Sequence, residues 1–327
     1  MEKGPDVPTL ARLPVTSSPD DVAAVIRRDG GVIIEGFITD EEVENIEKEL
    51  KPHWAKQGKY KGNLHGENDA PLSGLVGKSR TCALRILGHP LYSEVAKILL
   101  QDITYPWWGD TRSKCISDPI LAVSQAFTRG PNTLGQPLHR DDVPQHVKHI
   151  AGSGDSSLLG ILVAGTKCTY ENGGTQVIPG SHLWDDDRRA DPSMCTTAEM
   201  EKGDACMIIG SIWHGAGANK TSDQRRNIYS CHMVKGFLRQ DENQYLAIPR
   251  EIVESYPTKI QRLIGYSVSQ PYCGWVELDD PISMVAKEKK SLVPHDLQGI
   301  LIQGPGSEQE TIQPAATATA TAEVMVS

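Results

Sequence analysis

The sequence predicts a mainly β protein with flanking α-helices, and three successive regions with different patterns of apolar residues support this prediction. Up to about residue 104, apolar residues recur at helical spacing behind capping residues. From about residue 105 to 240 they form short runs separated by Gly, Asn and Asp, which is typical of strands joined by turns. Two short helical patterns, each introduced by a proline, then follow the β region.

The N-terminal part is expected to contain three helices. Ser18 and Pro19 supply an N-cap and an N1 proline for the first helix. Thr39 and Glu42 form a capping box, and apolar residues at helical spacing follow it. The third helix is expected over residues 91–100, where a stripe of Val, Ile and Leu recurs every three to four residues.

The β region is expected to contain five strands, each an apolar run bounded by turn residues. These strands cover residues 122–128, 158–164, 175–178, 205–209 and 227–237. The two C-terminal helices are expected at 250–255 and 259–263.

A single domain is expected over residues 1–303, because the 327-residue chain is 39% hydrophobic and can build a sizeable core. Within it we distinguish a helical part (18–104), a β core (about 105–240) and C-terminal helices with a lid-like segment (241–303). The remainder, 304–327, includes an Ala-Thr repeat without any core-forming pattern, and we predict that it is a disordered tail.

Composition argues against several classes of partner. The formal net charge is −9 and no long Lys/Arg run is present, so neither nucleic acid nor an anionic membrane surface is an expected partner. The sequence shows neither a signal-peptide pattern nor an apolar window of about 18 residues, and we expect a cytoplasmic protein. The seven cysteines form no CxxC pair, which favours reduced, structural thiols.

The segment from Gln136 to Asp142 reads QPLHRDD and contains the first candidate metal ligands. Residues i and i+2 of an extended strand project to one face, so His139 and Asp141 can serve one metal ion. His214 follows 75 residues later at the end of a short apolar pattern and can supply the third ligand. Two imidazoles and one carboxylate form the facial triad of non-haem Fe(II) oxygenases. A lone His-X-Asp is more often an ordinary pair of polar surface residues.

An arginine close to the predicted metal site is the second part of the pattern. Arg225 lies eleven residues beyond His214, where a returning strand comes back toward the metal. A guanidinium group is a charged, planar fork that matches the carboxylate of a dicarboxylate co-substrate. Arg226 competes for this role, since a strand alternates faces and only one of the two arginines can point inward. The nearby His146 and His149 are interpreted as polar loop residues.

Three stretches, QPLHRDD, ENGGTQVIPGSH and IWHGAGANKTSDQRRN, resemble the phytanoyl-CoA dioxygenase family of Fe(II)/2-oxoglutarate-dependent oxygenases, and within it the fungal branch that tailors secondary metabolites. The resemblance covers about residues 20–285. It implies a double-stranded β-helix, a cupin-like jelly roll in which two facing sheets enclose the site. No departure from the ligand triad is visible.

The resemblance also implies roles for individual residues. His139, Asp141 and His214 correspond to the iron ligands. Family spacing favours Arg225 over Arg226 as the residue that binds the distal carboxylate of 2-oxoglutarate. The polar contacts to the same co-substrate correspond to Gln136 and Thr175, and Phe127 and Tyr229 are expected in the wall of the substrate pocket.

The implied cofactor is Fe(2+), with 2-oxoglutarate and O2 as co-substrates and ascorbate as a supporting reductant. The expected reaction oxidises an unactivated C–H bond of an apolar, polycyclic secondary-metabolite intermediate, such as a terpenoid, meroterpenoid or alkaloid. Hydroxylation, desaturation and ring rearrangement all remain open as outcomes. A homodimer is a further expectation from the resemblance.

Three alternatives remain open at the level of sequence. The first is an acyl-CoA hydroxylase of the same family. The second is a zinc-dependent hydrolase that uses the same His-Asp-His set to activate water, although it leaves Arg225, Thr175 and Gln136 without a role. The third is a noncatalytic binding protein on the same fold, because a fold does not determine a function.

Overall fold

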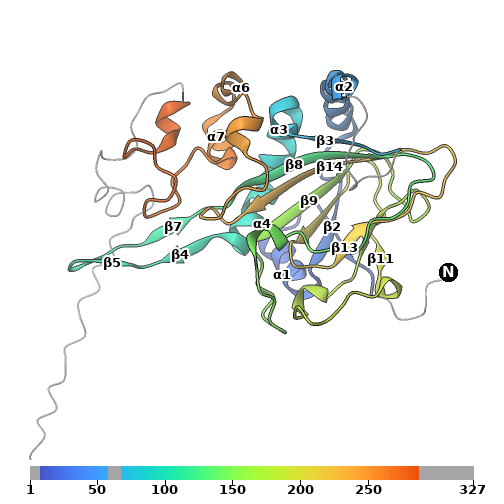
Figure 1. The fold of residues 1–327 in the computed structure, drawn as a ribbon, viewed down its shortest axis with the longest axis horizontal. Coiled ribbons are helices and arrows are strands. Elements are labelled where there is room, and N and C mark those ends of the chain that lie inside the picture. Colours follow the sequence, from blue (N-terminus) through green and yellow to red (C-terminus); the bar gives the residue numbers. More distant parts are fainter. Residues whose placement is uncertain (1–7, 58–67, 287–327) are drawn as a thin grey trace, which may run out of the picture.

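The computed structural model describes residues 8–57 and 68–286, and a seven-stranded mixed sheet is its largest element (Figure 1). The strand order is β1-β2-β12-β9-β14-β8-β3, with β1 parallel to β2 and all other neighbours antiparallel. The strands are β1 (Ala11–Pro14), β2 (Gly31–Glu35), β3 (Ala70–Ser73), β8 (Ile120–Arg129), β9 (Leu158–Ala164), β12 (Ala205–Ile209) and β14 (Arg226–Val234).

Burial explains the central position of β9 and β12. All seven residues of β9 and all five of β12 are buried. A continuous apolar run of this kind must be covered on both faces of the sheet. Helices cover one face, and a second, smaller sheet lies on the other side.

The face that packs against helices is called here the helical face. Helix α1 (Pro19–Asp29) packs against β2, and α4 (Pro90–Leu100) packs against β9. The buried hydroxyl of Tyr92 in α4 lies 2.8 Å from the carbonyl oxygens of both Leu159 and Cys231, which ties the helix to two central strands. The other helical elements before the C-terminal part are α2 (Asp40–Gln57), α3 (Leu75–Lys78) and the π-helix η1 (Cys82–Leu87).

The predicted helix caps are present. The Oγ of Ser18 accepts a hydrogen bond from the backbone N–H of Asp21 at 3.1 Å. Thr39 and Glu42 bond reciprocally, since each backbone N–H donates to the side chain of the other residue at 2.9 and 3.2 Å. These bonds satisfy N–H groups that lack a partner within the helix, and they explain where α1 and α2 begin.

The opposite, inner face of the main sheet lies toward the small sheet. Cys231 in β14 points to the helical face, because its Sγ lies 3.9 Å from that of Cys82 in η1. Side chains alternate along a strand, so the flanking Ser230 and His232 point inward. The small sheet has the order β11-β10-β13, with β10 (Thr175–Val177), β11 (Thr196–Thr197) and β13 (His214–Ala216).

Two further regions extend the fold. A long hairpin arm projects from the main sheet (Figure 1), in which β4 (Asp102–Thr104) pairs with β7 (Cys115–Ser117) and β5 (Trp107–Trp108) pairs with β6 (Thr111–Arg112). After β14 the chain forms α5 (Gln244–Ala247), α6 (Arg250–Ser255) and α7 (Thr258–Ile264). Short 3-10 turns occur at Val143–Gln145, Ser181–Leu183, Pro192–Met194 and Pro281–Met284.

The mainly β architecture with flanking helices is confirmed, and β9, β12 and α6 have the predicted bounds. The N-terminal part is less purely helical than predicted, because β1, β2 and β3 join the main sheet. The apolar run in β2 is short and almost entirely buried, which suits a strand inserted beside β12. The predicted tail and the end of the lid-like segment, residues 287–327, lie outside the described residues. No helix of the described residues is long and apolar enough to cross a membrane.

Candidate metal centre

The backbone places the three predicted ligands side by side between the two sheets. The N–H of His139 donates to the carbonyl of His214 at 2.8 Å, and the N–H of His214 donates to that of His139 at 3.0 Å. Directly paired residues of antiparallel strands present their side chains on the same face. Two residues further along, the N–H of Asp141 donates to the carbonyl of Gly210 at 2.8 Å and continues the pairing.

The side chains of this triad converge on one point. Nε2 of His139 lies 3.5 Å from Oδ1 of Asp141, and Nε2 of His214 lies 3.3 Å from Oδ2 of the same carboxylate. One donor atom from each of the three residues falls within 4.8 Å of the other two. The structure therefore brings together the three residues that the sequence singled out, in an arrangement that one metal ion can bridge.

The second ring nitrogen of each histidine is held by a backbone carbonyl. Nδ1 of His139 lies 2.9 Å from the carbonyl oxygen of Pro137, and Nδ1 of His214 lies 3.1 Å from that of Ile212. A proton on Nδ1 satisfies each of these bonds and leaves the lone pair on Nε2, which faces the centre. Metal-binding histidines commonly have this arrangement, because the second hydrogen bond fixes the tautomer and the ring orientation.

The electrostatics of the triad favour a bound cation. Burial by itself raises the pKa of Asp141, but His214 and a further histidine, His232, outweigh it and hold the pKa well below its usual value. Burial lowers the pKa of His214, yet the Asp141 carboxylate outweighs this and the net pKa is raised. For His139 burial dominates and lowers the pKa. The centre thus contains an ionised carboxylate and a largely neutral, partly exposed imidazole.

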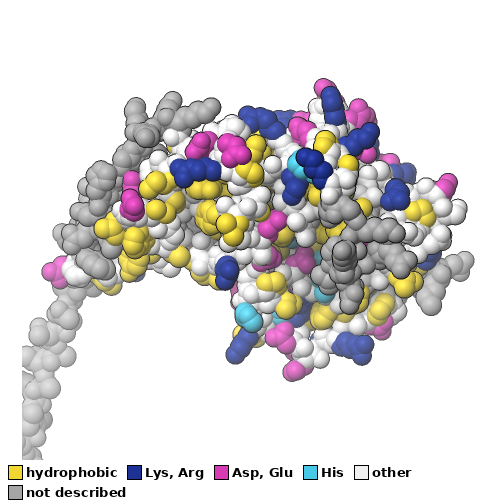
Figure 2. Space-filling model, turned by 45° about the horizontal axis from the view of Figure 1, so that its top comes forward, with side chains coloured by type: hydrophobic (Ala, Val, Ile, Leu, Met, Phe, Trp, Pro, Cys, Tyr) yellow, Lys and Arg dark blue, Asp and Glu magenta, His cyan; other side chains and the backbone are white. Residues whose placement is uncertain are grey.

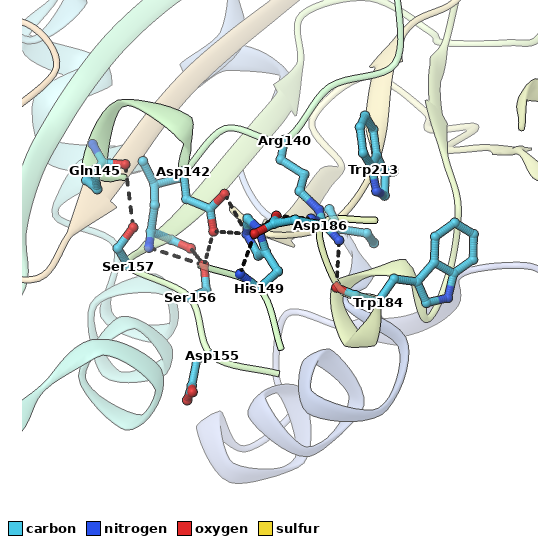
Figure 3. Close-up of polar contacts among 12 residues, drawn as sticks. Arg140, Asp142, Gln145, His149, Asp155, Ser156, Ser157, Trp184, Asp186 and Trp213 are labelled. Carbon is cyan, nitrogen blue, oxygen red and sulfur yellow. Dashed lines mark hydrogen bonds and ion pairs between the residues drawn. The ribbon is translucent and has the colours of Figure 1, made fainter. Parts of the chain in front are cut away.

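A polar network behind the triad connects the two ligand-bearing segments (Figure 3). Asp142 is fully buried, and each of its carboxylate oxygens lies 3.2 Å from Nε2 of His149. Nδ1 of His149 lies 2.6 Å from Oδ1 of Asp186, which also pairs with the buried Arg140 at 3.3 Å. The guanidinium of Arg140 stacks over the Trp213 ring at 5.1 Å. Residues adjacent to two triad members are thereby tied together.

His149 serves this network as a buried side chain, and His146 is exposed. Among the described residues, neither belongs to the group of possible ligands formed by the triad. Their interpretation as loop residues agrees with the geometry, although His149 is more deeply engaged in the structure than a polar loop residue.

The structure distinguishes the two candidate arginines by their burial. Arg225 is exposed just ahead of β14, whereas Arg226 is the first residue of the strand and is only 2% exposed. The inner face of β14 contains His232, and even-numbered residues of the strand share that face, so Arg226 points inward. The expectation that Arg225 points toward the site is therefore wrong, because sequence spacing cannot locate the strand's first residue to within one position.

Gln136 and Thr175 meet at the same strand of the small sheet. Thr175 is buried and is the cross-strand partner of Ala216 in β13. Oε1 of Gln136 accepts a hydrogen bond from the backbone N–H of Ala216 at 3.1 Å. Both residues therefore adjoin Ala216 of β13, which lies two residues beyond the candidate ligand His214.

The two aromatic residues predicted to line a substrate pocket lie on opposite faces of the main sheet. Phe127 is the cross-strand partner of Ile228, which shares the inner face with Arg226, and the Phe127 side chain is only partly buried. Tyr229 is fully buried and close to Glu47 in α2 and Cys82 in η1. Tyr229 thus belongs to the helical face, so its assignment to the pocket wall is wrong.

Sequence reasoning missed His232. This buried residue of β14 has its Nε2 atom 3.1 Å from Oδ2 of Asp141. The signal available in the sequence was parity, because His232 follows Arg226 by six residues and both must share one strand face. That signal requires knowing which arginine points inward.

Comparison with known proteins agrees with the geometry. The profile of the phytanoyl-CoA dioxygenase family matches residues 26–227. The chain belongs to this family. It is 36% identical to the dioxygenase peniF of Penicillium patulum over 272 residues, covering 81% of this chain and 88% of the relative. It is 34% identical to the dioxygenase swnH1 of Arthroderma benhamiae, covering 84% and 91% of the two chains.

A solved structure supports the fold assignment. The non-haem, α-ketoglutarate-dependent epimerase SnoN from nogalamycin biosynthesis superposes with a TM-score of 0.51 at 21% identity, covering 67% of this chain and 83% of SnoN. The cupin-like fold predicted from sequence is therefore confirmed. Together with the named relatives, family membership makes this protein an oxidoreductase of the dioxygenase type.

Proposed function

We propose that this protein is an Fe(II)- and 2-oxoglutarate-dependent dioxygenase in which His139, Asp141 and His214 bind the iron. The observation that carries this proposal is the convergence of two freed Nε2 atoms and one ionised carboxylate within 4.8 Å. Two imidazoles and one carboxylate are the donor set of non-haem Fe(II) oxygenases, which keep the remaining coordination positions for exogenous ligands. The residues present therefore fit this metal.

The second part of the proposal assigns the distal carboxylate of 2-oxoglutarate to Arg226. Arg129 and Arg226 are directly paired across β8 and β14, and both are almost fully buried. Asp69 pairs with Arg129 at 3.5 Å and also acts electrostatically on Arg226, so this single carboxylate faces two adjacent cations. A buried cation needs a charged partner, and a dicarboxylate supplies it. The Nε atoms of both arginines also have no hydrogen-bond partner among the described residues.

The protein contributes position, charge and shielding to the reaction. The metal, when bound, supplies the chemistry that activates O2 at the expense of the keto acid. The carbonyls of Pro137 and Ile212 hold both imidazole rings in the metal-binding tautomer. Arg226 orients the keto acid from its far end, and Gln136, from the segment before His139, and Thr175, from β10, stabilise its flank. The main sheet, whose central strands are fully buried, closes this side of the site to bulk water.

For the substrate we propose an apolar, polycyclic secondary-metabolite intermediate, which is oxidised at an unactivated C–H bond. The inner face of the main sheet offers apolar side chains next to the site, among them Phe127 and Ile228. A CoA thioester carries several phosphates and calls for a cluster of Lys and Arg at the pocket mouth. Basic and acidic side chains of the described residues are instead interspersed over the face shown in Figure 2. The fungal relatives are also named dioxygenases.

A substrate screen tests the proposal. The enzyme is incubated with Fe(II), 2-oxoglutarate, ascorbate and a library of polycyclic fungal intermediates, and succinate and oxidised products are measured by mass spectrometry. We expect at least one intermediate to give succinate and an oxidised product in matched amounts. The Asp141→Ala variant should give neither. A matched control is Asp155→Ala, which removes an exposed carboxylate that takes no part in the polar network of Figure 3.

Two outcomes would contradict parts of the proposal. Coupled hydroxylation of a branched acyl-CoA, with only background succinate from every polycyclic compound, would overturn the substrate class but leave the cofactor assignment. Metal-dependent hydrolysis with Zn(II), without any consumption of 2-oxoglutarate, would overturn the dioxygenase chemistry itself.

A further inference from the structure

His232 lies on the floor of the candidate metal centre without being part of the triad. It belongs to the inner face of β14, and its side chain is 8% exposed. Its cross-strand partner on β9 is Gly160. The imidazole is therefore fixed on a central strand of the main sheet, across from the small sheet that carries His214.

The Asp141 carboxylate is in contact with His232. Nε2 of His232 lies 3.1 Å from Oδ2 of Asp141, which is closer than either triad histidine is to this carboxylate. His232 is nevertheless outside the group of donor atoms that lie within 4.8 Å of one another. It touches one member of the triad from the side, as expected for a group that orients a ligand and does not itself bind the metal.

The polar atoms of His232 are otherwise unused. Neither Nδ1 nor Nε2 forms a hydrogen bond of acceptable geometry with the described residues, although the distance from Nε2 to Oδ2 suits one. A small rotation of the Asp141 carboxyl group about its Cβ–Cγ bond is enough to align this contact at little cost. A buried imidazole whose nitrogens both lack a partner is unfavourable, and the neighbouring carboxylate is the available acceptor.

The main sheet has a space for this ring. A Cβ placed on Gly160 would lie 2.5 Å from Cδ2 and 2.6 Å from Nε2 of His232. Real Cβ atoms do not approach other atoms so closely, so any side chain at position 160 would displace the ring. The absence of a side chain on a fully buried central strand is costly for strand stability, and close approach of another group is a usual reason for it.

We propose that His232 is a positioning residue that donates a hydrogen bond from Nε2–H to Oδ2 of Asp141, and that Gly160 provides the room for it. The bond orients the carboxylate so that it presents a defined oxygen to the metal, in line with the two triad imidazoles. Outer hydrogen-bond partners of metal ligands typically change metal affinity by about 10- to 100-fold. This inference rests on the proposed function, since it requires that Asp141 binds the iron.

The test is an anaerobic Fe(II) titration of four variants, read as metal affinity and as the visible band of the enzyme with Fe(II) and 2-oxoglutarate. His232→Leu removes the donor and is expected to weaken Fe(II) binding about 10- to 100-fold. His232→Gln keeps an N–H donor at a similar reach and should restore most of the affinity. Gly160→Ala keeps the His232 side chain but displaces its ring, so it should weaken Fe(II) binding as His232→Leu does. Cys231→Ala is the matched control, because the side chain of this neighbour points to the helical face.

The outcomes separate this inference from the proposed function. If the wild-type protein binds no Fe(II) and develops no band with 2-oxoglutarate, the proposed function fails. If the wild type binds normally and His232→Leu titrates like it, with an unshifted band, only the role of His232 is overturned. Equal loss in His232→Leu, His232→Gln and Cys231→Ala would indicate general damage to β14 and would also contradict the positioning role. Should His232→Leu not fold, the comparison of His232→Gln with Gly160→Ala decides the question.

Discussion

Replacing Arg226 by Gln should separate co-substrate binding from metal binding. The guanidinium is only 2% exposed, so water cannot take its place when the charge is removed. Loss of a buried, charge-assisted contact costs about 2–5 kcal/mol when the partner stays buried. At about 1.4 kcal/mol per tenfold change, the affinity for 2-oxoglutarate should fall about 30- to 4,000-fold. Fe(II) affinity should stay close to the wild-type value, because a guanidinium is always protonated and offers no lone pair to a metal ion.

The matched control is Arg225→Gln. This residue has the same charge and is the neighbour in sequence, but its side chain is exposed. We expect at most about a fivefold change in 2-oxoglutarate affinity, since an exposed charge contributes about 1 kcal/mol or less. The assay is an anaerobic titration of Fe(II)-loaded protein with 2-oxoglutarate, followed by its visible absorption. A large loss in Arg225→Gln together with normal binding in Arg226→Gln would refute the inference drawn from burial.

Three further predictions concern the surrounding structure. Tyr92→Phe should lower the free energy of unfolding by about 1–3 kcal/mol in urea denaturation, because two buried carbonyl oxygens lose their shared hydroxyl donor; an unchanged midpoint would contradict this. Arg140→Leu should lower stability by a similar ~1–3 kcal/mol and weaken Fe(II) binding, because it removes the stack on Trp213 and leaves buried carbonyls unpaired; normal values for both would show that the network is dispensable. In thiol labelling at pH 8, the exposed Cys273 should react first. Burial raises the pKa of Cys168 to about 11, so little of this thiol is ionised at pH 8 and its labelling should accelerate only as the pH rises; fast labelling of Cys168 in the folded protein would be the opposite result.

Local patterns were sufficient to predict the elements whose stability is local or whose burial is complete. The capping box at Thr39 identifies the start of α2, since its hydrogen bonds lie within one helical turn. The uninterrupted apolar runs of β9 and β12 predicted both strands with their bounds. By contrast, β13 contains only His214–Ala216. A strand this short owes its existence to partners far away in the sequence, and no local pattern reports those partners.

The candidate site likewise combines features that the sequence predicts with features that only the structure shows. The i, i+2 spacing of His139 and Asp141 follows from strand geometry and was predictable from sequence. The choice between Arg225 and Arg226 depends on where β14 begins, which is a one-residue question that only the register with β8 answers. The contact between His232 and Asp141 depends on how β14 lies across from the segment that carries Asp141. Nothing in the sequence near either residue specifies that distance.

The most direct test of the central claim is an anaerobic titration of the wild-type protein and Asp141→Ala with Fe(II) in the presence of 2-oxoglutarate. The wild type should bind one Fe(II) per chain and develop the visible band of an iron-bound keto acid. Asp141→Ala should lose this band, because it removes the only carboxylate of the triad, while the exposed-site control Asp155→Ala should keep it. Formation of the same band at the same Fe(II) concentration in Asp141→Ala would show that His139, Asp141 and His214 are not the metal centre.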